Sequence, residues 1–175
     1  SGVEPALATE GGDVCVQMYT SGTTGHPKGV QLTNDNLMAL LPQVTSGRWV
    51  EWRAADVSLV VMPLFHVAGS VYALCGLFVG ARNVMLREVV PQQVLDSVAR
   101  SHVTKLLLVP AVILFLLQSP GIREAELASL EMIFYGASPI PVELLRSALQ
   151  ILKCGFAQIY GLTETTAGIT MLGPE

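Results

Sequence analysis

From residue 57 onward, short apolar runs alternate with longer segments of helical character, and this alternation limits the possible folds. Five runs rich in Val, Leu, Ile and Phe predict buried strands, at residues 57–64, 83–88, 103–110, 130–138 and 154–161. The segments between them predict helices, at residues 67–80, 91–101, 111–118 and 141–149. Continuous apolar strands separated by such helices are typical of a parallel sheet that is covered on both faces. We therefore predict an α/β fold with a largely parallel sheet and helices on both faces.

Before residue 57, the sequence predicts a leader, a strand, a loop and a helix. Residues 1–13 are acidic and lack the apolar core of a secretory signal, so we expect them to be a leader outside the folded domain. A β-rich run at residues 14–20 leads into a glycine-rich loop. A helix that is capped by Thr33 or Asn34 is expected to follow this loop directly. Elsewhere, the polar residues 119–130 predict an exposed connection.

The composition restricts the partners and the location that we expect. The chain has 14 acidic and 10 basic residues, a formal net charge of -4 and no basic run, which argues against a nucleic-acid partner. Its three cysteines form no CxxC pair and have no histidine at metal-ligand spacing, so we expect a reducing, cytoplasmic location. The apolar run at residues 67–79 is too short to cross a bilayer, and Pro110 interrupts the run at residues 106–117. We therefore expect no transmembrane segment.

Loops with unusual chemistry follow four of the predicted strands. They are the glycine-rich loop, MPLFHVAG at residues 62–69, YGASPIP at residues 135–141 and YGLTETT at residues 160–166. In open α/β sheets, ligands bind at the carboxyl ends of the strands, in the loops that lead to helices. We therefore expect these loops to form a binding site together.

The glycine-rich loop, YTSGTTGHPKGV at residues 19–30, has the composition of a phosphate-binding loop. Glycines allow the backbone to turn its N–H groups toward a ligand, and the hydroxyls of Ser21, Thr23 and Thr24 add donors. Lys28 supplies a positive charge. The structural alternative for a shorter SGTTG sequence is a flexible glycine hairpin, but the full loop favours phosphate binding.

This loop differs from the Walker loop of many nucleotide-binding proteins. Counting from Gly22, Pro27 takes the place of the second required glycine, and Gly29 follows Lys28 where the Walker loop has the Ser or Thr that binds magnesium. A Walker-type ATPase is therefore disfavoured. A magnesium ion bound here needs an oxygen ligand from elsewhere in the chain.

The four loops, in this order, resemble the motifs of the adenylate-forming superfamily. This superfamily includes acyl- and aryl-CoA ligases, firefly-type luciferases and the adenylation domains of peptide synthetases. The resemblance covers residues 14–175 and implies part of the large N-terminal, AMP-binding domain, without the C-terminal domain that carries a catalytic lysine. The Pro-Leu-Phe-His form of the second loop favours the acyl-CoA ligases or their luciferase-like relatives.

The resemblance implies ATP-dependent activation of a fatty or aryl acid to an acyl-adenylate, followed by transfer of the acyl group to coenzyme A. By similarity, Lys28 would stabilise the leaving pyrophosphate, Thr163 would contact the α-phosphate and Glu164 would bind Mg²⁺. His66 would line the path between the carboxylate and the nucleotide. The residues expected to bind ATP and AMP are Thr20, Ser21, Gly22, Thr23, Thr24, Gly25, Lys28, Gly136, Ala137, Ser138, Tyr160, Gly161 and Thr163.

Without the resemblance, several of these residues have structural interpretations. A Thr-Glu pair such as Thr163 and Glu164 is often a helix cap, and a lone histidine such as His66 is often structural. His26 and His102 receive the structural interpretation. The acid pocket is expected to draw on the helix at residues 67–79 and on the strands that carry Tyr135 and Tyr160.

Later elements of the adenylate-forming fold are not recognised in the sequence, and none of the three lysines stands in the context of the family's catalytic lysine. We therefore expect the chain to carry the nucleotide half-site with little or no turnover of its own. The alternative is a non-catalytic nucleotide-binding or scaffolding fragment that another chain completes. Apolar faces left uncovered on such a fragment also predict self-association.

Overall fold

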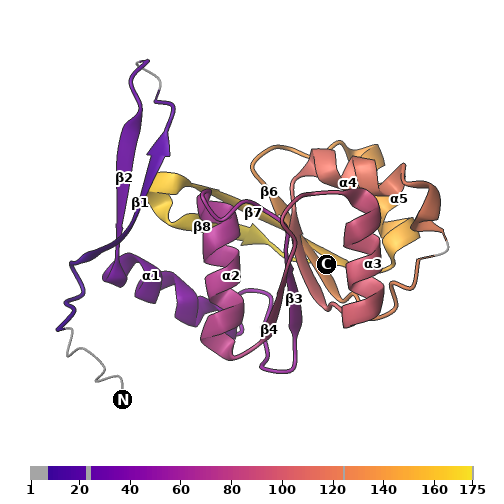
Figure 1. Cartoon of the computed structure of the whole chain (residues 1–175), viewed down its shortest axis with the longest axis horizontal. Helices are drawn as coiled ribbons and strands as arrows, with labels where there is room; N and C mark the ends of the chain where they lie inside the picture. The colour runs from indigo at the N-terminus through magenta and orange to yellow at the C-terminus, as the bar shows by residue number, and fades with distance from the viewer. Residues whose placement is uncertain (1–7, 23–24, 124, 175) are drawn as a thin grey trace.

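The computed structural model describes residues 8–22, 25–123 and 125–174 and contains a six-stranded sheet and a separate two-stranded hairpin (Figure 1). In spatial order, the large sheet consists of β4 (Arg82–Met85), β3 (Val57–Val60), β5 (Lys105–Leu108), β6 (Met132–Gly136), β7 (Gly155–Leu162) and β8 (Ala167–Leu172). All neighbouring strands are parallel except β7 and β8. The prediction of a largely parallel sheet is confirmed, although β8 was not predicted.

Helices cover both faces of this sheet, as the sequence predicted. The helix α2 (Val67–Val79) lies on one face, and the other face carries α3 (Pro91–Ser101), α4 (Pro110–Leu117) and α5 (Val142–Leu152) (Figure 1). Proline occupies the first turn of α3 and α4, where its missing N–H leaves no intrahelical bond unmade. In α5, Pro141 is the N-cap residue and the helix begins one residue later than predicted.

The sheet separates two apolar cores because successive side chains of a strand point to opposite faces. On β5, Leu106 and Leu108 belong to the core under α3, α4 and α5, whereas Leu107 belongs to the core under α2. On β6, Ile133 and Phe134 divide in the same way. Each of these five residues is less than one tenth exposed. The sheet is thus buried on both faces, as its continuous apolar strands indicated.

The N-terminal region differs from the prediction. The strands β1 (Val14–Thr20) and β2 (Lys28–Thr33) form an antiparallel hairpin that projects from the body of the molecule (Figure 1). The glycine-rich loop therefore joins two strands, and the predicted direct passage into a helix is wrong. Val30 and Leu32 alternate with polar residues at the spacing of a strand, and Leu32 is buried.

The helix α1 (Asn34–Leu40) begins where one of the two predicted caps stands. The N–H of Asn36 donates to Oγ1 of Thr33 at 3.3 Å, and the N–H of Thr33 donates to the side chain of Asn36 at 2.9 Å. This reciprocal pair is a capping box, so Thr33 is the cap. The segment expected to be a leader reaches this helix, because the N–H of Asp35 donates to the Gly11 carbonyl at 2.8 Å.

The described residues also contain three short 3₁₀ helices, η1 (Leu41–Thr45), η2 (Pro120–Ile122) and η3 (Thr163–Thr165). The predicted exposed connection at residues 119–130 is partly packed, because Ile122 and Leu130 are buried in the core under α3, α4 and α5. Within the part of the chain that the structure describes, no helix is long and apolar enough to cross a membrane.

Candidate active site

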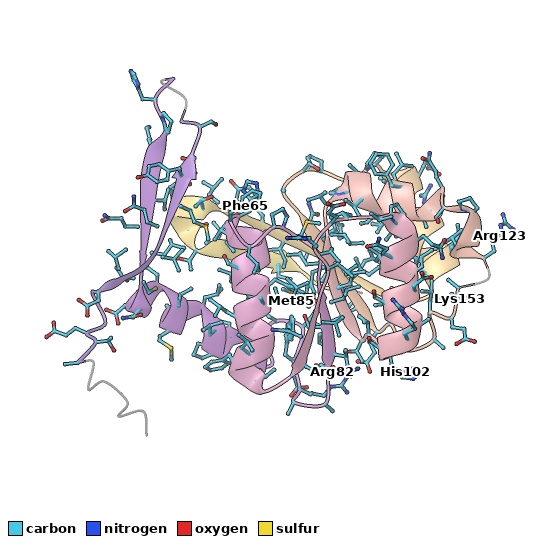
Figure 2. All side chains as sticks on the ribbon, viewed as in Figure 1. Phe65, Arg82, Met85, His102, Arg123 and Lys153 are labelled. Atoms are coloured by element: carbon cyan, nitrogen blue, oxygen red, sulfur yellow. The ribbon has the colours of Figure 1, made fainter. Side chains whose placement is uncertain are left out.

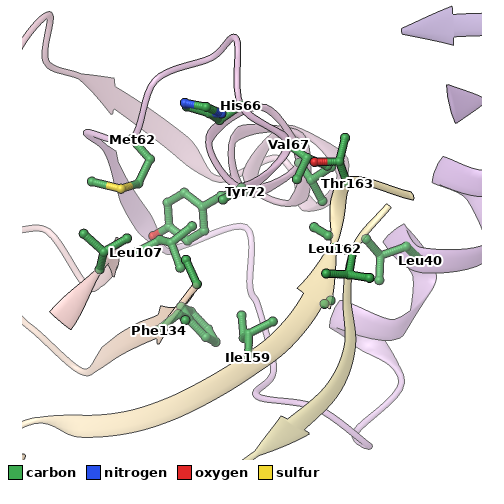
Figure 3. Close-up of a pocket in the computed structure, with 18 of the residues that line it drawn as sticks. Leu40, Met62, His66, Val67, Tyr72, Leu107, Phe134, Ile159, Leu162 and Thr163 are labelled. Atoms are coloured by element: carbon green, nitrogen blue, oxygen red, sulfur yellow. The ribbon is translucent and has the colours of Figure 1, made fainter. Parts of the chain in front are cut away.

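A pocket of about 770 Å³ opens at the carboxyl ends of β5, β6 and β7, where the sequence predicted a site. Its walls come from the glycine hairpin, the segment between β2 and β3, one side of α2, the three strand ends, η3 and β8. In Figure 3, His66, Val67 and Thr163 lie along one side of this pocket, while Leu107, Phe134 and Ile159 lie along the other. The volume is typical of sites for small ligands.

Most of the predicted site residues line this pocket, although they come from four separate segments. All four predicted catalytic residues are among them, namely Lys28, His66, Thr163 and Glu164. The predicted nucleotide-binding residues that also line it are Thr20, Ser21, Gly22, Gly136, Ala137 and Gly161. Gly25, Ser138 and Tyr160 are exposed and lie outside the lining. Thr23 and Thr24 lie outside the residues that the structure describes.

The glycine hairpin brings a hydroxyl-rich turn and a lysine to the pocket. Thr20 of β1 is directly opposite Lys28 of β2 in the hairpin, so their side chains are neighbours on one face of it. Gly22 has φ +64°, and a Cβ atom there would lie 2.5 Å from the carbonyl oxygen of His26. This tight turn therefore requires glycine. The strand β2 contacts η3, which brings the base of the loop near Thr163.

The side chains of Thr163 and Glu164 do not cap the turn in η3. The N–H of Leu162 donates to Oγ1 of Thr165 at 2.8 Å, so Thr165 closes the turn. The structural alternative, in which Thr163 caps a helix, therefore does not hold. Glu164 is exposed and is the carboxylate among the described pocket-lining residues.

Magnesium fits this donor set in one particular way. Within the described residues, no group of three or more His, Cys, Asp or Glu side chains forms a metal cluster. Mg²⁺ in phosphate-transfer sites is commonly held by one or two carboxylates together with substrate phosphates and water. Glu164 beside the glycine hairpin matches that arrangement, so the residues present fit a metal that arrives with a nucleotide.

The end of β6 has an unusual backbone conformation and lies very close to β7. Ala137 has φ 66°, a left-handed conformation that is uncommon for a residue with a side chain. At Gly136, a Cβ atom would lie 2.5 Å from the carbonyl oxygen of Ile159, so only glycine allows this close approach. Strained backbone of this kind is frequent at ligand sites.

His66 stands at the rim of the pocket because the loop before α2 packs closely on the helix. At Gly69, a Cβ atom would lie 2.3 Å from the Pro63 carbonyl oxygen, so a side chain would push the helix away. His66 is the N-cap residue of α2, and its ring lies 4.8 Å from the exposed ring of Phe65. His102, which received a structural interpretation, is the C-cap residue of α3. It lies far from Phe65, the neighbour of His66 at the pocket rim (Figure 2).

Apolar side chains that sequence reasoning did not single out form the deeper part of the pocket. Trp52, Tyr72 and Phe134 pack against one another there, with ring centroids 5.2 to 6.2 Å apart. The sequence had indicated only that α2, β6 and β7 would contribute. Burial raises the pKa of the Tyr72 hydroxyl far above its usual value and raises the pKa of the Cys75 thiol to about 12. Both groups are therefore neutral at physiological pH.

A buried ion pair lies beneath this aromatic group. Nζ of Lys105 is 3.0 Å from Oδ2 of Asp56, and the two side chains are 3% and 1% exposed. Burial acts to raise the pKa of Asp56, but the N–H of Arg53, the Lys105 ammonium group and the Thr104 hydroxyl together hold it below its usual value. The pair was not predicted. A lone lysine within the apolar run at residues 103–110 was the available signal.

Comparison with known proteins places the chain in a family. The family model described as AMP-binding enzyme matches residues 2–175. The fatty acid–[acyl-carrier-protein] ligase ScoC of Streptomyces coeruleorubidus is 38% identical over 160 residues, which are 90% of this chain and 31% of that protein. The 4-coumarate-CoA ligase 1 of Narcissus pseudonarcissus is 33% identical over 173 residues, 95% of this chain and 31% of that protein. The chain thus spans just under a third of the length of these relatives.

Solved structures show the same relationship. The inhibitor-bound N-terminal domain of FACL13 from Mycobacterium tuberculosis matches 98% of this chain and 42% of that chain, with a TM-score of 0.90 and 29% identity. The o-succinylbenzoate CoA synthetase MenE from Bacillus subtilis, in complex with ATP and magnesium, matches 95% of this chain and 34% of that chain, with a TM-score of 0.82 and 31% identity. The chain therefore belongs to the AMP-binding enzyme family, and its fold is that of the N-terminal domains of adenylate-forming enzymes.

Proposed function

We propose that the protein carrying this chain activates a carboxylic acid with ATP, giving an acyl-adenylate and pyrophosphate, and then transfers the acyl group to the thiol of coenzyme A. The observation that supports this most is the composition of the pocket. Its rim carries Lys28, Thr163 and Glu164, and its deeper part is lined by apolar side chains. Such a pocket accommodates a phosphorylated nucleotide and an apolar acid side by side.

The hairpin would act on the phosphates that leave. Ser21, Gly22 and Lys28 all line the pocket, and they would offer a hydroxyl, a backbone N–H and an ammonium group to the phosphates. Donors and positive charge that are fixed in place stabilise the charge that develops on a leaving pyrophosphate. Because β1 and β2 form a sheet of their own, these two strands would move toward the phosphates without breaking any strand pair of the large sheet.

The turn in η3 would act on the α-phosphate. Both residues line the pocket; the Thr163 hydroxyl would donate to an α-phosphate oxygen, and the Glu164 carboxylate would hold Mg²⁺. A bound magnesium ion would supply positive charge between the phosphate oxygens. His66 would stand at the rim where the attacking carboxylate approaches, and the backbone at Gly136 and Ala137 would lie along the adenine, with Ser138 and Tyr160 at its exposed edge.

The acid is proposed to be a fatty or aryl acid, because the deeper lining is apolar. Coenzyme A is the proposed acceptor. An acyl-carrier protein is a second candidate acceptor, because ScoC is named a fatty acid–[acyl-carrier-protein] ligase. Both acceptors present a thiol, so the adenylation step described above is the same for the two.

Pyrophosphate exchange and nucleotide binding test this proposal together. Isothermal titration calorimetry with magnesium-ATP and with AMP measures whether the 175-residue chain has the nucleotide half-site. Exchange of labelled pyrophosphate into ATP, with acetate, fatty acids and aryl acids, measures turnover. We expect nucleotide binding with little or no exchange, since a partly assembled site binds without stabilising the transition state.

The variants Lys28→Ala and Glu164→Ala are expected to weaken magnesium-ATP binding about tenfold or more, because each removes a charged contact to the phosphates or the metal. Lys153→Ala is the matched control, since this exposed lysine ends α5 and lies away from the pocket. Equal ATP affinities in all three variants would overturn the assignment of the site. Robust exchange by the chain alone would overturn the expectation that it is only a half-site.

A further inference from the structure

We propose that Trp52 forms the end wall of the acid-binding part of the pocket and thereby selects an acid with a compact apolar body, such as an aryl ring or a short alkyl chain. This inference rests on the proposed function, because it takes the apolar part of the pocket to hold the acid. It adds the residue that sets the size limit and the class of acid that fits.

Two other aromatic residues hold Trp52 in place. The Trp52 ring stacks on Phe134 with centroids 5.8 Å apart and planes at 11°, and it meets Tyr72 edge-on at 5.2 Å. Tyr72 and Phe134 complete the group at 6.2 Å. All three residues line the pocket and are at most 6% exposed. Stacked and edge-on rings stabilise one another by more than the burial of their apolar surface alone would give, so the three rings form a firm wall.

The buried ion pair lies directly behind this wall. Nζ of Lys105 is 5.9 Å from the centre of the Trp52 ring, within the range of a cation–π interaction, and is bound to Asp56. An acyl chain that displaced the indole ring would remove the aromatic neighbour of this cation and place apolar carbon against a buried charge pair. Both changes are unfavourable. The wall therefore resists displacement by a long chain.

The wall is also close to the rim where the carboxylate would react. On β6, Phe134 precedes the rim residue Gly136 by two positions. An extended strand rises about 3.3 Å per residue, which puts the start of the wall about 7 Å below the rim. Figure 3 shows Tyr72 and Phe134 across the pocket from Thr163. An acid bound at the rim meets the rings after the length of an aryl or short alkyl group.

Acyl-adenylate analogues of graded length test this inference. Isothermal titration calorimetry would measure the binding of AMP and of acylsulfamoyl adenosines that carry acetyl, butyryl, hexanoyl, octanoyl, dodecanoyl, palmitoyl or cinnamoyl groups. For the unaltered chain, we expect affinity to rise through the short acyl groups and the cinnamoyl group. It should then fall about tenfold or more at the first chain that reaches the wall, since an apolar pocket discriminates a single methylene by at least that factor.

The Trp52→Ala variant is expected to move this fall to a longer acyl group and to leave AMP affinity within about twofold, because Trp52 lies in the apolar part of the pocket. Trp52→Phe keeps an aromatic ring and should give a smaller shift, so the test survives if the alanine variant does not fold. Phe156→Ala is the matched control, because this buried aromatic residue lies in the other core. It should lower the melting temperature without moving the length limit.

The outcomes separate this inference from the proposed function. An unchanged length limit in folded Trp52→Ala, with AMP and short analogues still bound, would overturn the inference and show that the acyl chain takes another course. Tight binding of the palmitoyl analogue by the unaltered chain would overturn it as well. If neither AMP nor any analogue bound, the proposed function itself would fail.

Discussion

Nζ of Lys105 lies 3.0 Å from Oδ2 of Asp56, and this contact joins the start of the central strand β5 to the loop before β3. Both side chains are almost fully buried. Thr104 supports the pair, since its hydroxyl donates to Oδ1 of Asp56 at 3.0 Å. A charge pair in such a place is stabilising only while both partners and their hydrogen bonds are present.

Removing one partner of this pair should therefore destabilise the fold severely. We expect Asp56→Ala to lower the free energy of unfolding by about 3–5 kcal/mol, because it removes the nearer and buried carboxylate beside the Lys105 ammonium group and leaves only the half-exposed Glu131 at 3.9 Å. Urea denaturation followed by circular dichroism measures the change. The exposed pair of Arg146 and Glu143 provides a control, since Arg146→Ala should change stability by about 0.5 kcal/mol or less. Similar effects of the two variants would contradict the importance of burial.

The lowered pKa of Asp56 predicts that the stability of the fold depends on pH. The pKa of Asp56 is lower in the folded chain than its ordinary value of 3.8, so folding favours the ionised form. This contribution is fully present above the ordinary pKa and is lost as the pH falls from there through the folded pKa. Urea midpoints measured from neutral pH down to about pH 3 should fall less steeply for Asp56→Asn than for the unaltered chain. Parallel curves would contradict the lowered pKa.

Gly22 offers a test of the hairpin that does not disturb the large sheet. A side chain there meets the His26 carbonyl and a left-handed backbone, which costs an L-residue about 1–2 kcal/mol. We expect Gly22→Ala to weaken magnesium-ATP binding. The melting temperature of the chain should change little, because the hairpin is separate from the large sheet. Gly12→Ala is the control, since a Cβ atom there has open space. Equal ATP affinities in the two variants would count against a phosphate-binding role for the hairpin.

The cysteines should differ sharply in reactivity. Burial raises the pKa of both Cys75 and Cys154 to about 12, so neither forms a thiolate near neutral pH, whereas Cys15 is exposed. At about pH 8, we expect a thiol reagent to modify Cys15 quickly and the other two only after unfolding. Mass spectrometry of the labelled chain identifies the sites. Rapid labelling of folded Cys15→Ser would contradict the raised pKa values of the other two thiols.

Exposed apolar side chains on α2 and the neighbouring β4 predict self-association. Leu77, Phe78 and Met85 are 63%, 41% and 56% exposed. Large apolar side chains that are this exposed favour contact between copies of the chain. Light scattering should show particles larger than a monomer as concentration rises, and Leu77→Lys should reduce them. Gln150→Lys, on the exposed side of α5, adds the same charge elsewhere and should have no such effect. A compact monomer at high concentration would contradict this prediction.

The sequence predicted the large sheet well because its local signals agree with its tertiary structure. Apolar runs such as residues 103–110 became central strands, and Pro91 marked the first turn of α3. The hairpin was missed because a strand of six residues after a glycine loop has weak local signals, and the sequence VQLT was attached to the helix that follows. The strand β8 was missed because it becomes a strand through its antiparallel pairing with β7, which local sequence signals do not reveal.

The candidate site divides in the same way between local and tertiary information. Loop residues such as Lys28, His66 and Glu164 could be found because ordered motifs carry them, and the fold brings these motifs to one pocket. The wall formed by Trp52, Tyr72 and Phe134 could not be found, since its members come from a loop, a helix and a strand that meet only in the folded chain.

The division of the interior into two cores also affects how such a chain can change during evolution. The pocket draws on the core under α2, whereas the core under α3, α4 and α5 packs against the opposite face of the sheet. Substitutions at Tyr72 or Phe134 reshape the pocket, while residues such as Ile133 and Leu106 continue to hold the strands together. One face of the sheet can thus vary its ligand preference while the other preserves the scaffold.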